Sequence, residues 1–191
     1  MAQDTRARMI SGAARMVGSK GARSTSLRDL AHEAGVPIGS TYHHFPGGKQ
    51  QLVDEAVRAV GGHIDRIIAS ARADGVESAL ASLTGEWRRV LTGSDFRTGC
   101  AVLAVATEDD DGLRRTAMHI FDGWQTEMAG ILTDAGVPAQ RAPQLARMIV
   151  AAVEGAVALC RAERSTAPLD DVADELRLLI GTATVKSPRG S

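Results

Sequence analysis

Aromatic residues and cysteine are both scarce in this chain of 191 residues. Tryptophan, tyrosine and phenylalanine together make up only 3% of it. The two cysteines, Cys100 and Cys160, lie far apart in the sequence, and no second pair of metal ligands accompanies them. This excludes a zinc-binding spacing and a disulfide framework. We interpret both as small buried side chains, and nothing in the sequence supports a redox-sensing role.

The chain also has no long apolar run and almost no strand-like alternation of apolar and polar residues. A membrane span needs roughly 18 to 20 consecutive apolar residues, and no segment here reaches that length. The N-terminus lacks the apolar core of a signal peptide, so we expect a cytoplasmic protein without membrane contact. Apolar residues still make up 44% of the chain and recur with a helical period, which predicts an all-α fold with a sizeable core.

The signatures of common enzymes are missing as well. There is no phosphate-binding loop, nucleophile elbow or dinucleotide fingerprint. His43 and His44 are adjacent, so on a helix they point about 100° apart and cannot share one metal ion. The acidic run at residues 108–111 lies where a helix is expected to begin, and the helix dipole explains it. We therefore expect no enzyme, no bound metal and no cofactor.

The most informative segment runs from Ser26 to Lys49. Ser26 is a good N-cap, and the apolar residues that follow it share one stripe of a helix over roughly residues 26–34. Gly35 can adopt the left-handed conformation that ends such a helix, and Pro37 suits the first position of the next one. That second helix is expected to end near Phe45 and Pro46. Two short helices joined by a turn that contains glycine indicate a helix-turn-helix, which lays its second helix on DNA.

The distribution of charge supports this interpretation, although the net charge of the chain is only −1. Residues 1–49 contain seven lysines and arginines against three acidic residues, a net charge of +4. The other 142 residues carry a net charge of −5. The positive part of the chain is thus the part with the helix-turn-helix, as binding to a phosphate backbone requires.

These first fifty residues resemble the DNA-binding domain of TetR-family transcriptional repressors. In that family the recognition helix ends in a Tyr-x-x-Phe-like run, followed by a loop and a lysine, and here these are Tyr42, Phe45 and Lys49. The resemblance extends upstream through Thr25 and Ser26 to the helix that carries Ile10, Ala13, Ala14 and Val17. The chain departs from the family pattern in having Gly47 and Gly48 where a serine or aspartate cap is frequent, and Gln50 where glutamate is frequent.

The resemblance and the chemistry of the side chains together suggest which residues contact double-stranded operator DNA. We expect contacts to phosphates from Thr25 or Ser26 and from Tyr42, His43 and Lys49. We expect the residues nearest the base edges to be Pro37, Ile38, Ser40 and Thr41, with Gly39 allowing the backbone to approach. This helix contains no Arg, Asn or Gln, so direct readout should be modest and the shape of the DNA should contribute.

We divide the chain into a three-helix DNA-binding domain at residues 1–48, a helical effector-binding and dimerisation domain at 49–185, and a flexible tail at 186–191. The first helix is expected at 4–19 and a long helix at 49–73. The remaining helices are expected at 75–91, 99–106, 109–135, 139–162 and 169–183.

Four of the six aromatic residues fall between positions 87 and 124. Any one of them could be ordinary core, but together with nearby methionines and a cysteine they suggest the lining of an apolar pocket for a small hydrophobic effector. The proposed lining is Trp87, Phe96, Cys100, Leu103, Met118, Phe121, Trp124 and Met128. The segment from Phe96 to Ala106 also resembles a Gly-Cys-rich helix of the lincomycin-resistance-repressor branch of the TetR family.

The last two helices offer apolar seams, and the family resemblance implies that such helices from two chains form a four-helix dimer interface. The residues assigned to it are Met148, Ala152, Gly155, Ala156, Val172, Leu176 and Leu179. Alternatively, these helices close the core of a monomer. Glu154, the lone charge in its run, either pairs across the interface, faces a ligand or is satisfied by a local backbone group.

The sequence thus predicts a homodimeric repressor that a small apolar effector releases from a palindromic operator. An enzyme ranks well below this reading. A helical adaptor that binds only proteins would leave the pattern of Thr25, Tyr42 and Lys49 unexplained.

Overall fold

The computed structural model of the chain describes residues 2–184, and side chains from residue 4 onward. These residues form α-helices and one short 3-10 helix, with no strand among them, which confirms the predicted all-α fold. The predicted tail at residues 186–191 lies outside the described residues. No helix within residues 2–184 is both long and apolar enough to span a bilayer.

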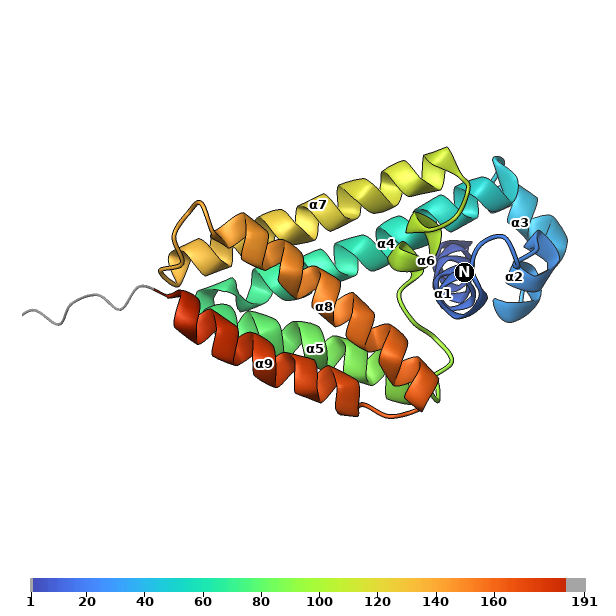
Figure 1. The fold of residues 1–191 in the computed structure, drawn as a ribbon. Coiled ribbons are helices and arrows are strands. Elements are labelled where there is room, and N and C mark those ends of the chain that lie inside the picture. Colours follow the sequence, from blue (N-terminus) through green and yellow to red (C-terminus); the bar gives the residue numbers. More distant parts are fainter. Residues whose placement is uncertain (1, 185–191) are drawn as a thin grey trace, which may run out of the picture. The chain divides into compact units, whose positions relative to one another are not determined.

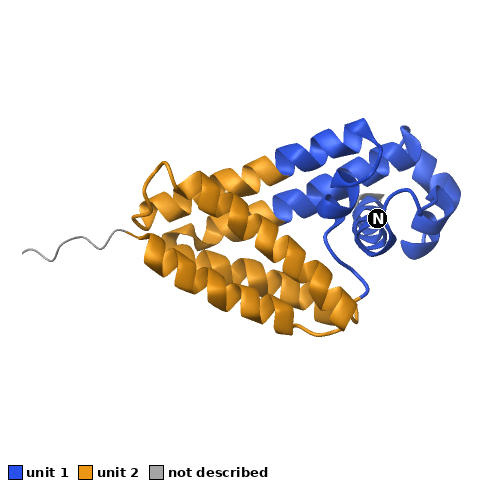
Figure 2. Ribbon diagram, viewed as in Figure 1, with its two compact units in different colours: residues 1–63, 97–120 blue, residues 64–96, 121–191 orange. Residues whose placement is uncertain are grey.

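Each of the two compact units of the chain is built from two separate stretches of sequence (Figure 2). Unit 1 comprises residues 1–63 and 97–120, and unit 2 comprises residues 64–96 and 121–191. The domain boundary expected after residue 48 rests on the sequence alone and stays a prediction. In the structure, residues 97–120 group with the N-terminal helices, a non-local association that no local pattern announces.

Unit 1 contains the N-terminal helices and a returning segment (Figure 1). Its elements are α1 (Ala2–Lys20), α2 (Leu27–Glu33), α3 (Ile38–His44), the first part of α4 (Gly48–Ala71), α6 (Ala101–Ala106) and the first part of α7 (Asp111–Asp134). Its apolar cluster draws buried residues from α1, α2 and α4 and from Phe45, which directly follows α3. The fully buried members Met9, Leu30, Phe45 and Leu52 come from α1, α2, the end of α3 and α4 in turn.

The returning segment of unit 1 holds the end of α1 through backbone contacts. The N–H of Gly99 donates a hydrogen bond to the carbonyl of Gly18 at 2.9 Å. Glu108 accepts hydrogen bonds from the N–H groups of Ala22, at 2.6 Å, and Arg23, at 3.1 Å. Within the acidic run, therefore, Glu108 binds the turn after α1, whereas Asp110 caps α7 by accepting a hydrogen bond from the N–H of Leu113 at 2.9 Å.

Unit 2 is a bundle whose last two helices pack along each other and against α5. Its elements are the remainder of α4, the 3-10 helix η1 (Arg72–Asp74), α5 (Val76–Gly93), the remainder of α7, α8 (Ala142–Glu163) and α9 (Ala167–Ala183). Its buried core includes Leu80, Leu91, Trp124, Met128 and Ile131. Two ion pairs add to the packing of this unit, joining Arg88 to Asp170 and Arg164 to Asp95.

Every expected helix is present, and most ends lie within three residues of the expected positions. The largest shift is three residues, at the start of α8. The helix expected from residue 139 begins at Ala142, after a turn that starts at Pro138. The last helix begins at Ala167 rather than 169, with Pro168 in its first turn, where a missing N–H costs little.

Gly18 gives a direct test of the packing between α1 and the returning segment. A Cβ at this position would lie 2.4 Å from the carbonyl oxygen of Gly99, and a backbone oxygen cannot simply rotate away. We expect Gly18→Ala to lower the free energy of unfolding by about 1 to 3 kcal/mol, measured by urea denaturation. Gly85→Ala, in open space within α5, is the matched control and should raise stability by about 0.5 to 1 kcal/mol. Equal effects of the two substitutions would contradict the close approach.

Candidate nucleic-acid interface

Helix α2 begins with a complete capping box. The Oγ of Ser26 accepts a hydrogen bond from the N–H of Asp29 at 3.1 Å, and a carboxylate oxygen of Asp29 accepts one from the N–H of Ser26 at 3.0 Å. The hydrogen bonds from the hydroxyl and the backbone of Ser26 lower the pKa of Asp29. The Ser26 side chain is thus committed to the helix start while the residue itself stays exposed.

The turn between α2 and α3 depends on Gly35, which has a φ of +64°. Its N–H and that of Val36 donate hydrogen bonds to the carbonyls of His32 and Ala31, both at 3.0 Å. A Cβ on Gly35 would meet no atom within 4 Å, so the backbone conformation, not space, requires glycine here. The sequence suggested Pro37 as the first helical residue of α3. In the structure it is the N-cap, the residue just before the helix.

The exposed side chains of α3 form a surface of mixed chemistry. Tyr42 is 60% exposed and Ile38 is 43% exposed, both high for large side chains with apolar surface. His43 is exposed and Ser40 is half-buried, and a Cβ on Gly39 would meet nothing within 4 Å. These residues leave the backbone at the start of α3 accessible and offer one hydroxyl, one phenol and one imidazole.

Two of the predicted DNA contacts, Thr41 and Thr25, are buried in unit 1, which contradicts a contact through their side chains. The side chain of Thr41 is 0% exposed, and its hydroxyl has no hydrogen-bond partner among the described residues. Thr25 is 2% exposed, and its hydroxyl donates to the carbonyl of Gly21 at 2.8 Å. Neither hydroxyl is presented on the surface, so Thr41 packs α3 against the core and Thr25 closes the turn after α1.

The start of α4 is capped by a side chain that the sequence did not single out. Gly48 has a φ of +64°, and the N–H of Gly47 donates a hydrogen bond to the side-chain oxygen of Gln51 at 2.8 Å. The two glycines are therefore accompanied by a glutamine cap from one turn further along the helix. Lys49 is half-buried in the first turn of α4 and forms no salt bridge with any described residue.

Both paired and unpaired cations occur at this end of unit 1. Arg6 pairs with Glu55, and Arg15 pairs with Glu33 at 3.0 Å. Within residues 4–184, by contrast, Lys49 and Arg28 have no such partner. Arg28 was not among the residues predicted from the sequence. Its place in the first turn of α2 was the available signal, because a cation there opposes the helix dipole and needs another reason to be present.

The residues proposed to line an apolar pocket divide between the two units. In unit 2, Trp87, Trp124 and Met128 are buried, and the rings of Phe121 and Trp124 meet edge to face with centroids 5.3 Å apart. Phe96 is half-buried in the same unit and has a φ of +57°.

The other three proposed lining residues belong to unit 1. The Sγ of Cys100 caps α6 by accepting a hydrogen bond from the N–H of Leu103 at 3.4 Å, and Leu103 is half-buried. Met118 is 51% exposed, so it does not line an enclosed apolar space within unit 1. Neither cysteine forms a disulfide within the described residues, both are buried, and burial raises the pKa of the Cys160 thiol.

Helices α8 and α9 of unit 2 carry exposed apolar side chains. The large ones are Met148 and Leu159 on α8 and Leu178 on α9, the last of which is 65% exposed. The predicted residues Gly155, Ala152, Val172 and Leu179 are exposed or half-buried, whereas Ala156 and Leu176 are buried in the core of the chain itself and are corrected accordingly. Glu154 is also buried and interacts with another group within the described residues, and its role stays a prediction.

Two family models match the chain in succession. The model described as bacterial regulatory proteins of the tetR family matches residues 9–56. The model described as the C-terminal domain of transcriptional regulators like LmrA and YxaF matches residues 76–175.

Relatives and solved structures agree with these matches. An uncharacterised HTH-type transcriptional regulator of Mycobacterium tuberculosis is 37% identical over 186 residues, covering 93% of this chain and 95% of the relative. The HTH-type transcriptional regulator LmrA of Bacillus subtilis is 28% identical, covering 87% of this chain and 91% of the relative. A TetR-family regulator from Agrobacterium tumefaciens has the same fold, with a TM-score of 0.81 at 19% identity, covering 97% of this chain and 100% of that one.

The buried hydroxyl of Thr41 yields a test of which α3 residues can reach a nucleic acid. Thr41→Val removes an unpartnered hydroxyl and keeps the shape, so the free energy of unfolding should be unchanged or rise by up to about 1 kcal/mol. Binding to nucleic acid should stay at the wild-type level. Ser40→Ala, at the neighbouring accessible position, is the control that should alter binding in a gel-shift titration. If Thr41→Val lost sequence discrimination and Ser40→Ala did not, Thr41 would contact the bases as the sequence predicted.

Proposed function

Because this chain belongs to the TetR family of bacterial transcriptional regulators, with a C-terminal domain of the LmrA/YxaF-like type, we propose that it is an effector-controlled repressor of a palindromic operator. TetR-family regulators bind DNA and act as dimers. The observation that carries the proposal is the exposed face of α3 beside cations without acidic partners. Its DNA lies in the bacterial cytoplasm, so the protein acts there.

The contacts to base edges come from the start of α3. Ile38 can touch a thymine methyl group, Ser40 can hydrogen-bond a base, and Gly39 lets the backbone approach. Pro37 fixes the approach of the chain just before the helix. With one apolar group and one hydroxyl, direct readout is limited, so the sequence-dependent shape of the operator supplies part of the discrimination.

The contacts to phosphates surround that helix. Tyr42 and His43 follow on α3, and Lys49 lies in the first turn of α4, where free backbone N–H groups and the helix dipole also attract an anion. At the start of α2, Ser26 is exposed, and Arg28 adds a charge without an acidic partner. These groups fix the position of the protein on the duplex, and α3 reads the sequence.

Lys49→Ala tests the assignment to the phosphate backbone. A phosphate contact carries no sequence information, so binding should weaken to a similar extent on operator and unrelated DNA. The slope of log affinity against log salt should become shallower by about one unit. Fluorescence anisotropy at several salt concentrations measures both quantities.

Arg66→Ala is the matched control for Lys49→Ala. Arg66 is an exposed cation on the same helix, about 25 Å further along its axis at 1.5 Å per residue, and its loss should leave the salt slope unchanged. A Lys49→Ala variant that keeps the wild-type slope and changes only sequence preference would overturn the assignment.

We propose that two copies associate through the apolar face of α8 and α9. Support comes from the exposure of Met148, Leu159 and Leu178. The small residues between Met148 and Leu159 on α8 also allow two helices to approach closely. Each copy then sets one α3 in a major groove, and the two grooves are about one duplex turn, roughly 34 Å, apart. A palindromic operator follows from this symmetry.

Leu178→Glu tests the proposed dimer. A carboxylate placed at the centre of an apolar interface would be desolvated, so we expect the dimer dissociation constant to rise by more than about 10-fold. Sedimentation velocity over a dilution series measures it. Met118→Glu, which replaces a comparably exposed apolar side chain of unit 1, should leave association unchanged. A Leu178→Glu protein that remains dimeric at wild-type concentrations contradicts the assigned face.

The proposed effector is a small apolar molecule that binds in the domain formed by residues 49–185. Support comes from the aromatic side chains in and around the core of unit 2, among them Trp87, Phe121 and Trp124. Helix α4 contributes residues to both units and begins at the DNA-binding end, so it is the natural element to transmit a change.

An effector releases the operator only if it binds the DNA-incompetent state more tightly. A hundredfold preference, about 2.7 kcal/mol, is sufficient for a useful response. Screening apolar compounds for release of the protein from DNA upstream of its own gene tests this part of the proposal.

A further inference from the structure

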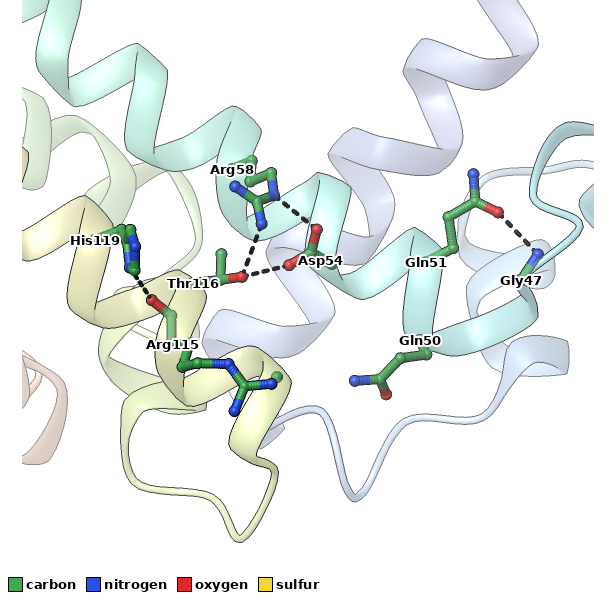
Figure 3. Close-up of a pocket in the computed structure, with 9 residues that line it drawn as sticks. Gly47, Gln50, Gln51, Asp54, Arg58, Arg115, Thr116 and His119 are labelled. Atoms are coloured by element: carbon green, nitrogen blue, oxygen red, sulfur yellow. Dashed lines mark hydrogen bonds and ion pairs between the residues drawn. The ribbon is translucent and has the colours of Figure 1, made fainter.

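Unit 1 contains a cavity that none of the residues assigned to the apolar effector lines. It lies between the first parts of α4 and α7 and has a volume of about 710 Å³ (Figure 3). Every side chain that lines it is polar or charged, or belongs to glycine. The residues that matter for its chemistry are Gln50, Asp54, Arg58, Arg115, Thr116 and His119. Such a lining offers several hydrogen-bonding groups to a polar ligand.

One wall of the cavity is neutralised by a closed network. Arg58 donates hydrogen bonds to Asp54 at 2.7 Å and to the hydroxyl of Thr116 at 3.1 Å. That hydroxyl in turn donates to the other oxygen of Asp54 at 2.6 Å (Figure 3). The charge of Arg58 is therefore matched inside the protein, and this wall is fixed in place.

Unlike Arg58, Arg115 has no matching carboxylate in a salt bridge among the described residues. It lies one turn before His119 on α7. Its guanidinium forms no salt bridge with any residue between 4 and 184. It does interact electrostatically with Asp110, whose pKa is lowered mainly by the hydrogen bond from the N–H of Leu113, then by the side chain of Gln50 and to a smaller extent by Arg115. Asp110 is thus already engaged at 2.9 Å by each of these first two donors. Arg115 remains as a cation in the lining with hydrogen-bond donors to spare.

His119 adds a second group with a defined orientation. Its Nδ1–H donates to the backbone carbonyl of Arg115 at 2.8 Å, which fixes the ring and leaves Nε2 for another partner (Figure 3). The side-chain amide of Gln51 is held by Gly47 and Glu55, so it belongs to the frame of the cavity. An anchoring cation, an oriented imidazole and a rigid polar frame together suit the recognition of a carboxylate or phosphate group.

We propose that this cavity binds a small anionic metabolite, with Arg115 as the residue that anchors its carboxylate or phosphate group and His119 as a second contact. The cavity begins at Gly47 and Gln50, on either side of Lys49 in sequence. A bound anion therefore places negative charge close to a cation that we assign to the operator backbone, and it opposes DNA binding. This last consequence rests on the proposed function, whereas binding of the anion does not.

Isothermal titration calorimetry of the full chain without DNA tests the site, with inorganic phosphate and citrate as separate probes at constant ionic strength in chloride. We expect saturable binding of at least one probe, and the stronger probe identifies the group that the site prefers. Arg115→Gln should weaken it by about tenfold or more, the loss of a charge-assisted contact. Arg114→Gln is the matched control, because the adjacent Arg114 pairs with Asp111 and does not line the cavity, and it should bind as wild type does.

Absence of saturable binding of both probes, or equal affinity in wild type and Arg115→Gln, overturns the proposal. A second measurement, operator affinity by anisotropy, should show weaker DNA binding at saturating probe in wild type and no such effect in Arg115→Gln. If Arg115→Gln lowers the salt slope of DNA binding without any probe, Arg115 is a phosphate contact and the anion site is also overturned. The calorimetry is done without DNA, so it still tests anion binding if the protein binds no DNA. The proposed anion site and the proposed DNA-binding function can therefore fail separately.

Discussion

The burial of Phe45 is the constraint on which the presentation of α3 depends. Its ring is fully buried in the apolar cluster of unit 1, and its backbone joins two helices. The N–H of Phe45 donates to the carbonyl of Thr41, and its own carbonyl accepts from the N–H of Gly48, both at 2.8 Å. One side chain therefore fixes where α3 ends and where α4 begins. The guanidinium of Arg6, which pairs with Glu55 of α4, lies 5.1 Å from the centre of the ring and ties α1 to the same point.

The returning segment explains why unit 1 is discontinuous in sequence. Residues 97–110 form hydrogen bonds with backbone groups at and just after the end of α1, through Gly99 and Glu108. A carboxylate that accepts two backbone N–H groups can be replaced by few other side chains, and the contact between Gly18 and Gly99 leaves no space for a Cβ. Both devices fix the position of α6 against α1, within the unit that carries the DNA-binding surface.

Local rules predicted most of the fold and part of the surface. The helix periods, the Ser26 cap and the left-handed Gly35 depend on neighbours in sequence, and the structure confirms each of them. The resemblances to the TetR family and its lincomycin-resistance-repressor branch are also confirmed.

The errors concern properties that only packing decides. Thr41 differs little from Ser40 in propensity, yet a rotation of about 100° along α3 turns it into the core. Arg115 and Gln50 are distant in sequence, so the cavity that they share leaves no local pattern.

Helix α4 is held in unit 1 by two kinds of contact that respond differently to disturbance. Its apolar face packs into the cluster around Phe45, while Gly61 allows Ile120 of α7 to approach so closely that a Cβ would lie only 2.8 Å away. Its polar face is tied to α7 through Asp54, Arg58 and Thr116. Close packing tolerates little sliding, because displaced side chains must leave their rotamers, whereas the strength of the polar contacts depends on the charges beside them. An anion bound beside this network can therefore change the charge near the start of α4 without disrupting the core that presents α3.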